Sequence, residues 1–376
     1  MVESKRCIFH VPYKINKEVT SGTNIRPIKM IDGFKLNGYK VDIIEGYGEK
    51  RKNAIEEIKN NIKQGIKYDF VYSESSTMPT QLTEKNHIPK YPFLDFGFLK
   101  FCKDNLIPIG LFYRDIHWKF PQYKNSVNIV KQLVSKVFYE YDLKKYRQLI
   151  DVLYLPSNKM FKYLDIDFNG QIYDLPPGTE QIDLTFYGCK NEDASKLIKL
   201  FYVGGINEEL YNLKLLFKAV KENKNLFLTL CCRENEWENN KQEYEEYLND
   251  RINIIHKKGE ELIPIARNSD IMNLYIKPTA YWEFAMPVKL FTYLSYEKPM
   301  LGVKNTSAGD FIEKNNIGWS IEYNFESINE FFKGLSREHI REKEGNLPLI
   351  CENNTWKSRA KKVIEDLNNF SCNGGV

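Results

Sequence analysis

The chain has 376 residues, 42% hydrophobic and 28% charged, the composition of a globular protein long enough for two domains of ordinary size. The longest uncharged apolar run, residues 106–112, is too short to span a bilayer, and the first residues contain no apolar signal core. The seven cysteines lack the spacing of a disulfide framework, so we expect a cytoplasmic protein.

The net charge of +4 is unevenly distributed. Residues 1–180 carry 28 Lys and Arg against 21 Asp and Glu, whereas the remainder carries 26 against 29. The basic half could face a polyanion or an anionic membrane surface, and a scattered solvated surface explains it equally well. Because no basic run is interleaved with aromatic residues, we expect no nucleic-acid partner.

The first half of the chain alternates between strand-like and helix-like segments. Apolar runs predict strands, and amphipathic or charged segments between them predict helices. The predicted strands are residues 7–13, 40–47, 68–75, 106–115 and 151–157. The predicted helices are residues 24–37, 52–64, 124–143 and 158–164. Residues 171–180, QIYDLPPGTE, predict a proline-glycine turn that connects two domains.

A second series of the same kind follows. The predicted strands are residues 197–205, 226–232, 251–256, 270–278, 298–303 and 317–323. The predicted helices are residues 209–222, 237–249, 259–267, 287–296, 308–315, 326–335 and 354–368. Apolar strands alternating with helices predict parallel sheets covered on both faces. We therefore expect an α/β protein with two facing Rossmann-like, doubly wound domains, 1–175 and 176–350, an interdomain cleft, and a last helix within 351–376 that packs back on the first domain.

Doubly wound sheets bind ligands beyond the carboxyl ends of their strands. The segment TAYWEFAMPVKLFTYLSYEKPML, residues 279–301, follows such a strand. Pro287 suits the first turn of a helix, and Lys289 would lie in that turn, where backbone amides already favour an anion. The pattern predicts a phosphate site, with Glu283 in the loop before it. The alternative is a salt bridge between Lys289 and Glu283 with no ligand.

Five segments in order resemble a known family: YLPSNKM with YDLPPGTE, KLFYVGGINEELYNLKLLFKAV, NSDIMNLYIKP with MPVKLFTYLSYEKPMLGV, SAGDFIEKNNIGWSIEY, and TWKSRAKKVIEDL. They are similar to segments of GT-B glycosyltransferases of the retaining family 4 type. The resemblance implies the GT-B fold and a nucleotide-sugar donor, with a UDP-sugar favoured, held mainly by the C-terminal domain. It implies no cofactor and no metal.

The resemblance also assigns donor-binding roles. Lys289 matches a position that contacts donor phosphates or sugar, and it would stabilise the departing diphosphate during catalysis. Glu283 matches an acidic residue that faces the donor sugar. Gly204 and Gly205 match the loop whose backbone approaches the phosphates.

The chain departs from the family pattern at three positions. Gly205 stands where an arginine is usual, the lysine that normally follows is missing, and Thr292 stands where a glutamate usually binds the ribose. Thr292 could still make one hydrogen bond. Arg233, after the next predicted strand, is the candidate replacement for the missing charge, and pairing with Glu234 or Glu236 is the alternative.

Two segments of the first half also carry candidate residues. Ser21 and Gly22 match the glycine-containing loop that such enzymes place against the donor diphosphate and the acceptor. Arg114, Asp115 and His117 follow the fourth predicted strand, and Asp115 and His117 are candidate catalytic residues. His117 could bond a donor sugar hydroxyl, and Asp115 or Arg114 could bind the acceptor. A structural histidine, and a capping or ion-pair role for Asp115, are the alternatives.

Residues 119–147 contain a basic amphipathic pattern. Apolar residues recur at helical spacing, and they are Val127, Val130, Leu133, Val134, Val137, Phe138 and Tyr141. The helix could lie on an anionic membrane or pack on its own domain. Asp165 and Asp167 have the spacing of a metal-binding DxD pair but precede the interdomain turn, so we expect no metal there.

The sequence thus predicts an enzyme that transfers a sugar, with retention, to a glycan or lipid-linked oligosaccharide during cell-surface polysaccharide synthesis. It would be a cytoplasmic protein with peripheral contact to the inner face of the membrane. One alternative is a sugar-nucleotide epimerase or hydrolase with Asp115 or His117 as base. Another is a catalytically degenerate binding or scaffold subunit, which the departures at the donor site favour.

Overall fold

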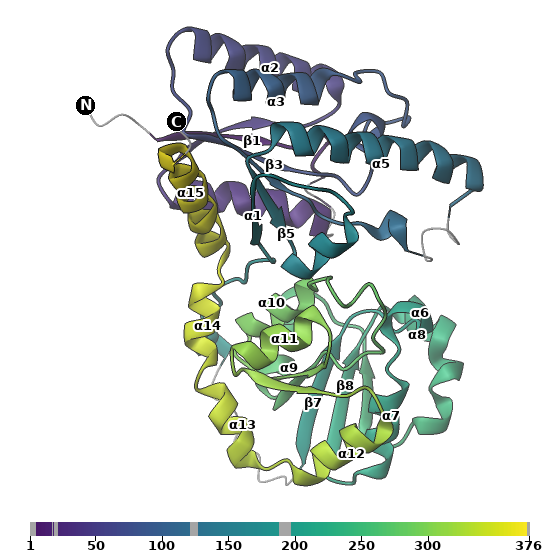
Figure 1. Ribbon diagram of the computed structural model, residues 1–376. Helices are drawn as coiled ribbons and strands as arrows, with labels where there is room; N and C mark the ends of the chain where they lie inside the picture. The colour runs from purple at the N-terminus through teal and green to yellow at the C-terminus, as the bar shows by residue number, and fades with distance from the viewer. Residues whose placement is uncertain (1–4, 17, 19–21, 121–126, 188–196, 374–376) are drawn as a thin grey trace. The chain divides into compact units, whose positions relative to one another are not determined.

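The computed structural model describes residues 5–16, 18, 22–120, 127–187 and 197–373. The chain divides into two compact units (Figure 1). The first, called here the N-terminal unit, is Met1–Gly178 together with Trp356–Val376, and the second, the C-terminal unit, is Thr179–Thr355.

The N-terminal unit contains a six-stranded parallel sheet in the order β2-β1-β3-β4-β5-β6. Its strands are β1 (Arg6–His10), β2 (Lys40–Ile44), β3 (Phe70–Glu74), β4 (Ile109–Phe112), β5 (Val152–Leu155) and β6 (Gln171–Asp174). The turn predicted over 171–180 needs correction. The first four residues of that segment form β6, which pairs in parallel with β5. The prolines that suggested a turn follow the strand.

Helices cover both faces of this sheet (Figure 1). They are α1 (Gly22–Leu36), α2 (Gly48–Lys63), α3 (Leu94–Asp104), α5 (Ile129–Leu149) and α15 (Trp356–Asn373). α1 and α15 lie side by side, and a Cβ at Gly33 would lie 2.7 Å from the carbonyl oxygen of Trp356. The glycine therefore permits the close approach of these two helices.

Some helix predictions for this unit need correction. The helix predicted over 158–164 is a 3-10 helix, Asn158–Tyr163, and α3 was not predicted. The helix predicted to begin at residue 124 is described only from Ile129, since 124–126 lie outside the described residues. Asn128 caps it, because its side-chain oxygen accepts a hydrogen bond from the Val130 amide at 2.9 Å.

The C-terminal unit contains a second six-stranded parallel sheet, in the order β12-β11-β10-β7-β8-β9. Its strands are β7 (Ile198–Val203), β8 (Leu226–Cys231), β9 (Ile252–Ile255), β10 (Ile271–Asn273), β11 (Met300–Val303) and β12 (Gly318–Ile321). Successive residues of β7 point to opposite faces of the sheet and pack in different cores. Tyr202 packs with the cluster of α7 and α12, and Phe201 packs with that of α9 and α10.

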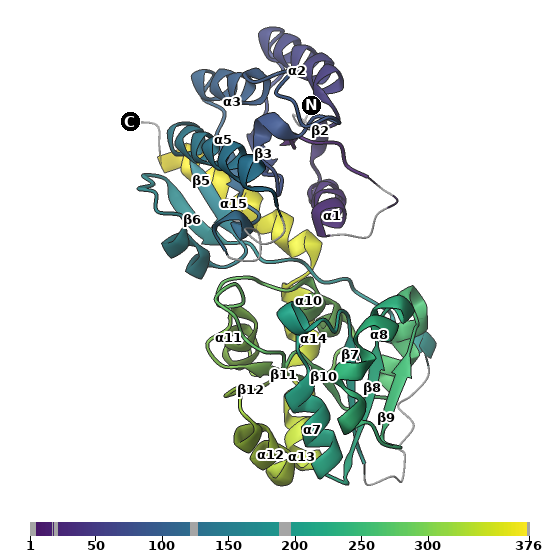
Figure 2. The ribbon, with the colours of Figure 1, turned by 90° about the vertical axis from the view of Figure 1, so that its right-hand side faces the viewer.

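The helices of this unit lie on both sides of the sheet, with α7 and α12 side by side (Figure 2). They are α6 (Glu208–Tyr211), α7 (Lys214–Glu222), α8 (Glu234–Asn240), α9 (Leu262–Arg267), α10 (Val288–Ser295), α11 (Ser307–Lys314), α12 (Phe325–Gly334), α13 (Arg337–Glu344) and α14 (Leu347–Asn353). The single helix predicted over 209–222 is two helices, and 237–249 is only partly helical. In the described part of the chain, no helix has the length and apolar content needed to cross a membrane.

Asp142 of α5 is a buried carboxyl group in the N-terminal unit. Its Oδ2 accepts a hydrogen bond from the Thr80 amide at 2.7 Å. Burial raises the pKa of Asp142 to about 7, although the hydrogen bond from Thr80 acts in the opposite direction. The folded chain therefore holds this proton more tightly than the unfolded chain, and the free energy of unfolding falls as pH rises from about 4 towards 7.

We expect Asp142→Asn to stabilise the protein at pH 8, because the amide keeps an acceptor for Thr80 and carries no charge to bury. A gain of about 1 kcal/mol would raise Tm by roughly 2–4 °C or less in a chain of this size. Thermal unfolding between pH 4 and pH 8 measures it, with Asp104→Asn on the exposed face of α3 as control. A gain that does not shrink towards pH 4 would contradict the proposed cause.

Candidate functional site

The strand order of the C-terminal unit contains a topological switch beside β7. The chain passes from β7 outward to β8 and β9 and then returns to β10, on the other side of β7. In sheets of this kind, a crevice forms beyond the carboxyl ends of the two strands at the switch, and ligands bind there. The strand order therefore points to the space beyond Val203 and Asn273.

A cavity of about 310 Å³ lies at this position. Its lining comes from the ends of β7 and β11, the loops around β10 and the first residues of α10. Four of the lining residues are aromatic, and they are Tyr202, Tyr211, Tyr281 and Trp282. Of the described residues that line it, Lys289 is the one with a charged side chain.

Lys289 lies in the first turn of α10, as the sequence predicted. Its Nζ donates a hydrogen bond to the hydroxyl of Tyr202 at 2.8 Å. It also lies 4.5 Å from the ring centroid of Tyr202 and 4.4 Å from that of Tyr211, within the range of cation–π attraction. The ammonium thus contacts Tyr202 instead of forming the alternative salt bridge with Glu283.

Burial lowers the pKa of Lys289 from 10.5 to about 7, and the nearby carboxylate of Glu236 acts in the opposite direction. The side chain therefore gains or loses its proton near neutral pH. A diphosphate placed beside it would favour the charged form of Lys289. The amides at the start of α10 would favour binding of the diphosphate anion itself. The arrangement suits an anionic ligand, because the negative charge of such a ligand would compensate the positive charge of the ammonium.

Gly204 makes room for this lysine. Its φ is +143°, and a Cβ there would lie 2.0 Å from Nζ and 2.3 Å from Cε of Lys289. The backbone is fixed by the Gly204 amide, which donates to the carbonyl of Cys231 at 2.9 Å. A side chain at this position would displace the ammonium, so Gly204 and Lys289 form one structural unit.

Gly205 is also closely surrounded. A Cβ there would lie 2.7 Å from the ring of Tyr211 and 2.9 Å from Oε1 of Glu236. Its carbonyl accepts a hydrogen bond from the Tyr202 hydroxyl at 2.5 Å, and the same Oε1 of Glu236 accepts from the Ile206 amide at 2.9 Å. An arginine at this position would require these neighbours to move, which accounts for the glycine.

The other predicted donor residues do not line the cavity. Glu283 lies in the turn before α10, where its carbonyl accepts from the Ser307 hydroxyl at 2.7 Å. Pro287 immediately precedes the helix, so its predicted place in the first turn was wrong by one residue. Thr292 is exposed on α10, and Arg233 is exposed just before α8. The donor roles of Glu283, Thr292 and Arg233 stay predictions.

The N-terminal unit has its own switch, between β1 and β3. Glu74, at the end of β3, is fully buried and holds two guanidinium groups. Arg114 Nη2 donates to its Oε2 at 2.7 Å and to the Tyr13 hydroxyl at 3.2 Å, and Arg26 Nε donates to its Oε1 at 3.2 Å. Neither Glu74 nor Arg26 was predicted from the sequence. The predicted acceptor role of Arg114 stays a prediction beside this structural one.

Asp115 and His117 form a local turn after β4. Asp115 Oδ1 accepts a hydrogen bond from the His117 amide at 3.0 Å, and Oδ2 lies 3.7 Å from His117 Nδ1. Burial lowers the pKa of His117, against the effect of the Asp115 carboxylate, so the imidazole is neutral at pH 7. The bond from the His117 amide is that of an Asx turn, and the cap of the following 3-10 helix (His117–Lys119) is Ile116, so Asp115 is not its capping residue. The catalytic roles of both residues stay predictions.

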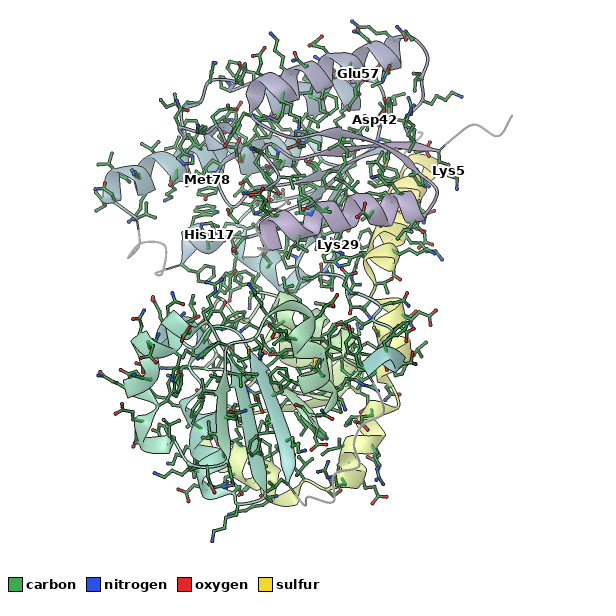
Figure 3. The ribbon with its side chains drawn as sticks, turned by 180° about the vertical axis from the view of Figure 1, so that it is seen from behind. Lys5, Lys29, Asp42, Glu57, Met78 and His117 are labelled. Carbon is green, nitrogen blue, oxygen red and sulfur yellow. The ribbon has the colours of Figure 1, made fainter. Side chains whose placement is uncertain are left out.

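His117 and Met78, both labelled in Figure 3, line a second cavity, of about 540 Å³, beside the start of α5. Gly22 begins α1, and Ser21 lies outside the described residues, so their predicted diphosphate loop stays a prediction. Asp165 pairs with Lys119 at 2.7 Å, and Asp167 lies 3.5 Å from Arg147. Within the described ranges, no three His, Cys, Asp or Glu residues are grouped as metal ligands.

The aromatic lining of the first cavity was not predicted. Tyr281 and Trp282 stand in the loop segment AYWEF, and two aromatic residues in a loop after a strand are a usable signal for a binding site. Tyr202 gave no such signal, because an aromatic residue inside a strand also fits a core position.

No protein-family model and no curated protein matches the chain. Solved structures match over almost its whole length. Sucrose-phosphate synthase from Thermosynechococcus elongatus has 12% identity and a TM-score of 0.61, covering 98% of this chain and 99% of that one. A glycosyltransferase from Rickettsia africae has 14% identity and a TM-score of 0.58, covering 99% and 100%.

HepE from Anabaena, solved in complex with UDP, has 9% identity and a TM-score of 0.61, covering 97% of this chain and 100% of that one. All three resemble this chain across both units. The chain therefore has the GT-B glycosyltransferase fold with two Rossmann-like domains, which confirms the predicted fold class.

We expect a diphosphate ester to bind more weakly as pH rises above 7. The free protein loses the Lys289 proton near that pH, whereas the diphosphate favours the ammonium, so binding at higher pH takes up a proton. Calorimetry should show Kd rising by up to about tenfold per pH unit above 7, with a buffer-dependent enthalpy.

Lys289→Met should weaken binding at pH 6.5 and remove this pH dependence, because the other described residues that line the cavity include no titrating cation. Lys277→Met, an exposed lysine nearby in the chain, serves as control and should retain the dependence. An unchanged pH profile in Lys289→Met would exclude Lys289 as the titrating group.

Proposed function

We propose that this protein is a glycosyltransferase that takes a sugar from a UDP-sugar bound by the C-terminal unit. The observation that carries the proposal is the partly buried ammonium of Lys289 at the switch-point cavity and the start of α10. HepE was solved with UDP and with UDP-glucose, and a structural neighbour from E. coli with UDP-2-fluoro glucose. These ligands support UDP as the nucleotide.

The proposed reaction breaks the bond between the anomeric carbon and the β-phosphate oxygen and forms a bond from an acceptor hydroxyl oxygen to that carbon. The acceptor proton passes to the departing phosphate, so no protein base is needed, and the configuration is retained. Lys289 and the amides at the start of α10 stabilise the charge that develops on the diphosphate. Metal is not part of the proposal.

Gly204 supports this role, because the absence of a side chain lets both the lysine and a phosphate approach the backbone. Gly205 stands in place of an arginine, so in this proposal Lys289 supplies the positive charge for the diphosphate. Exposed Arg233 is the proposed second source of positive charge. Among the described residues that line the cavity, none has a carboxylate or imidazole that could act as a base on the sugar, which disfavours an epimerase at this site.

A panel of nucleotide sugars tests the function. We expect UDP-sugars to raise Tm and to be hydrolysed slowly, with release of UDP. Lys289→Ala should lower the hydrolysis rate by about 10²-fold or more, because it removes charge stabilisation of the leaving group. If no nucleotide stabilises the protein, the enzymatic proposal fails. Stabilisation without turnover, even with glycan and lipid-linked acceptors, would instead favour a binding subunit.

We further propose a glycan or lipid-linked oligosaccharide as acceptor, in cell-surface polysaccharide synthesis at the inner face of the membrane. The supporting feature is α5, where part of the apolar stripe is largely exposed among the residues that the structure describes. Val130, Leu133 and Val137 are 63%, 64% and 65% exposed, and Lys131 and Lys136 are exposed beside them. An exposed apolar stripe flanked by lysines suits an anionic bilayer surface.

Vesicle co-sedimentation tests this contact. The protein should sediment with vesicles containing phosphatidylglycerol and much less with neutral phosphatidylcholine vesicles, because lysines add attraction only to the former. Leu133→Asp with Val137→Asp should reduce sedimentation at least about tenfold, whereas Leu349→Asp, at an exposed site on α14, should not. Equal sedimentation of the two variants would contradict the assignment to α5.

A further inference from the structure

Away from the hydroxyls of Tyr202, Tyr211 and Tyr281, the cavity beside Lys289 offers few hydrogen-bonding groups. Besides the four aromatic residues, most of its lining is aliphatic: Leu274, Ile276, Ala285, Met286, Val303 and Ala308 belong to this group. A sugar whose hydroxyls all point into such walls would lose its hydrogen bonds to water without replacement. The composition of the walls therefore restricts the substituents that fit.

Several polar side chains of the lining already have partners within the protein. The Thr306 hydroxyl donates to the carbonyl of Val303 at 2.7 Å and accepts from the Gly309 amide at 3.0 Å. The Trp282 indole donates to the carbonyl of Leu210 at 3.3 Å. Neither side chain is therefore readily available to a sugar hydroxyl.

Three backbone amides of the aliphatic wall are used as well, whereas the first amides of α10 are left for the diphosphate. Those of Leu274, Ile276 and Ala285 donate to the carbonyls of Leu301, Leu274 and Tyr281, at 2.7, 3.0 and 3.0 Å. The Tyr202 hydroxyl donates to one backbone carbonyl and accepts from Lys289. The remaining protons of Lys289 are suited to the diphosphate.

From this distribution we infer that the preferred donor sugar carries a methyl-bearing substituent, an acetamido group or a 6-deoxy methyl, that packs against the aliphatic wall. The inference rests on the proposed function and narrows its substrate class. Aromatic rings accommodate the apolar face of a pyranose, and the aliphatic residues accommodate the methyl group. A nucleobase is the less suitable occupant, because the hydrogen-bonding groups on its edge would face the same aliphatic residues and find no partners there.

The test compares donors that share one nucleotide. Calorimetry measures Kd for UDP, UDP-glucose, UDP-N-acetylglucosamine and UDP-6-deoxyglucose. We expect at least one methyl-bearing donor to bind about tenfold or more tightly than UDP-glucose, as is typical for a hydrophobic pocket that discriminates by one small group. The donor with the higher affinity shows whether the methyl group belongs to an acetamido substituent or to a 6-deoxy sugar.

A variant in the wall provides an independent check. Ile276→Thr keeps the branched shape and adds a hydroxyl, so the preference over UDP-glucose should fall by about threefold or more while the Kd for UDP is unchanged. Leu349→Thr, on the exposed face of α14, is the matched control and should alter neither value.

The outcomes separate this inference from the proposed function. If UDP binds and UDP-glucose binds as tightly as both methyl-bearing donors, or more tightly, the inference is overturned and the glycosyltransferase proposal stands. The same holds if all four ligands bind equally, which would place the base or the phosphates alone in the pocket. If UDP and all donors fail to bind, the proposed function itself is overturned.

Discussion

The enclosed ammonium of Lys289 is the constraint around which the crevice of the C-terminal unit is organised. Removing an ammonium from water costs several kcal/mol, and two aromatic rings and one hydroxyl offset only part of this cost. The lowered pKa reflects what is left uncompensated. Gly204 is required because any side chain there would occupy the position of the ammonium. The surroundings thus admit a cation without neutralising it.

The sheet delivers these residues to one place. Tyr202 packs its ring into the cluster of α7 and α12, yet its hydroxyl meets Lys289 from α10. A second tyrosine links the same elements, since the Tyr293 hydroxyl of α10 accepts a hydrogen bond from the Val203 amide at the end of β7 at 2.9 Å. The first turn of α10 is therefore fixed to the end of β7, where the strand order opens the crevice.

The sequence was sufficient where local pattern determines the structure. Long apolar strands alternating with helices predicted two parallel sheets, and the strand-end rule located Lys289, because both depend on neighbouring residues. It was insufficient where distant residues meet. Glu74 and Arg114 are 40 residues apart, and neither has a neighbour in the sequence that indicates their buried pairing.

Two elements that the sequence did not predict, the strand β6 and the helix α13, were missed because their local patterns are weak. β6 is four residues long and only half-buried, so its pattern is weak, and prolines directly after it favoured a turn. In α13, Ile340 is the buried residue, and a single apolar contact does not produce a helical period. Tyr202 was missed for the opposite reason: its pattern is strong, but it is that of a core residue, and only its hydroxyl takes part in the site.

The solved neighbours show how far fold and site can separate. At 9–14% identity the architecture is kept over nearly the whole chain, because many combinations of apolar residues fill the same layers. A site tolerates fewer combinations. Gly205 could not become arginine without displacing Tyr211 and Glu236, so a change there requires compensation nearby. A partly buried lysine whose pKa is lowered in the free protein is explained by a ligand whose negative charge restores the balance.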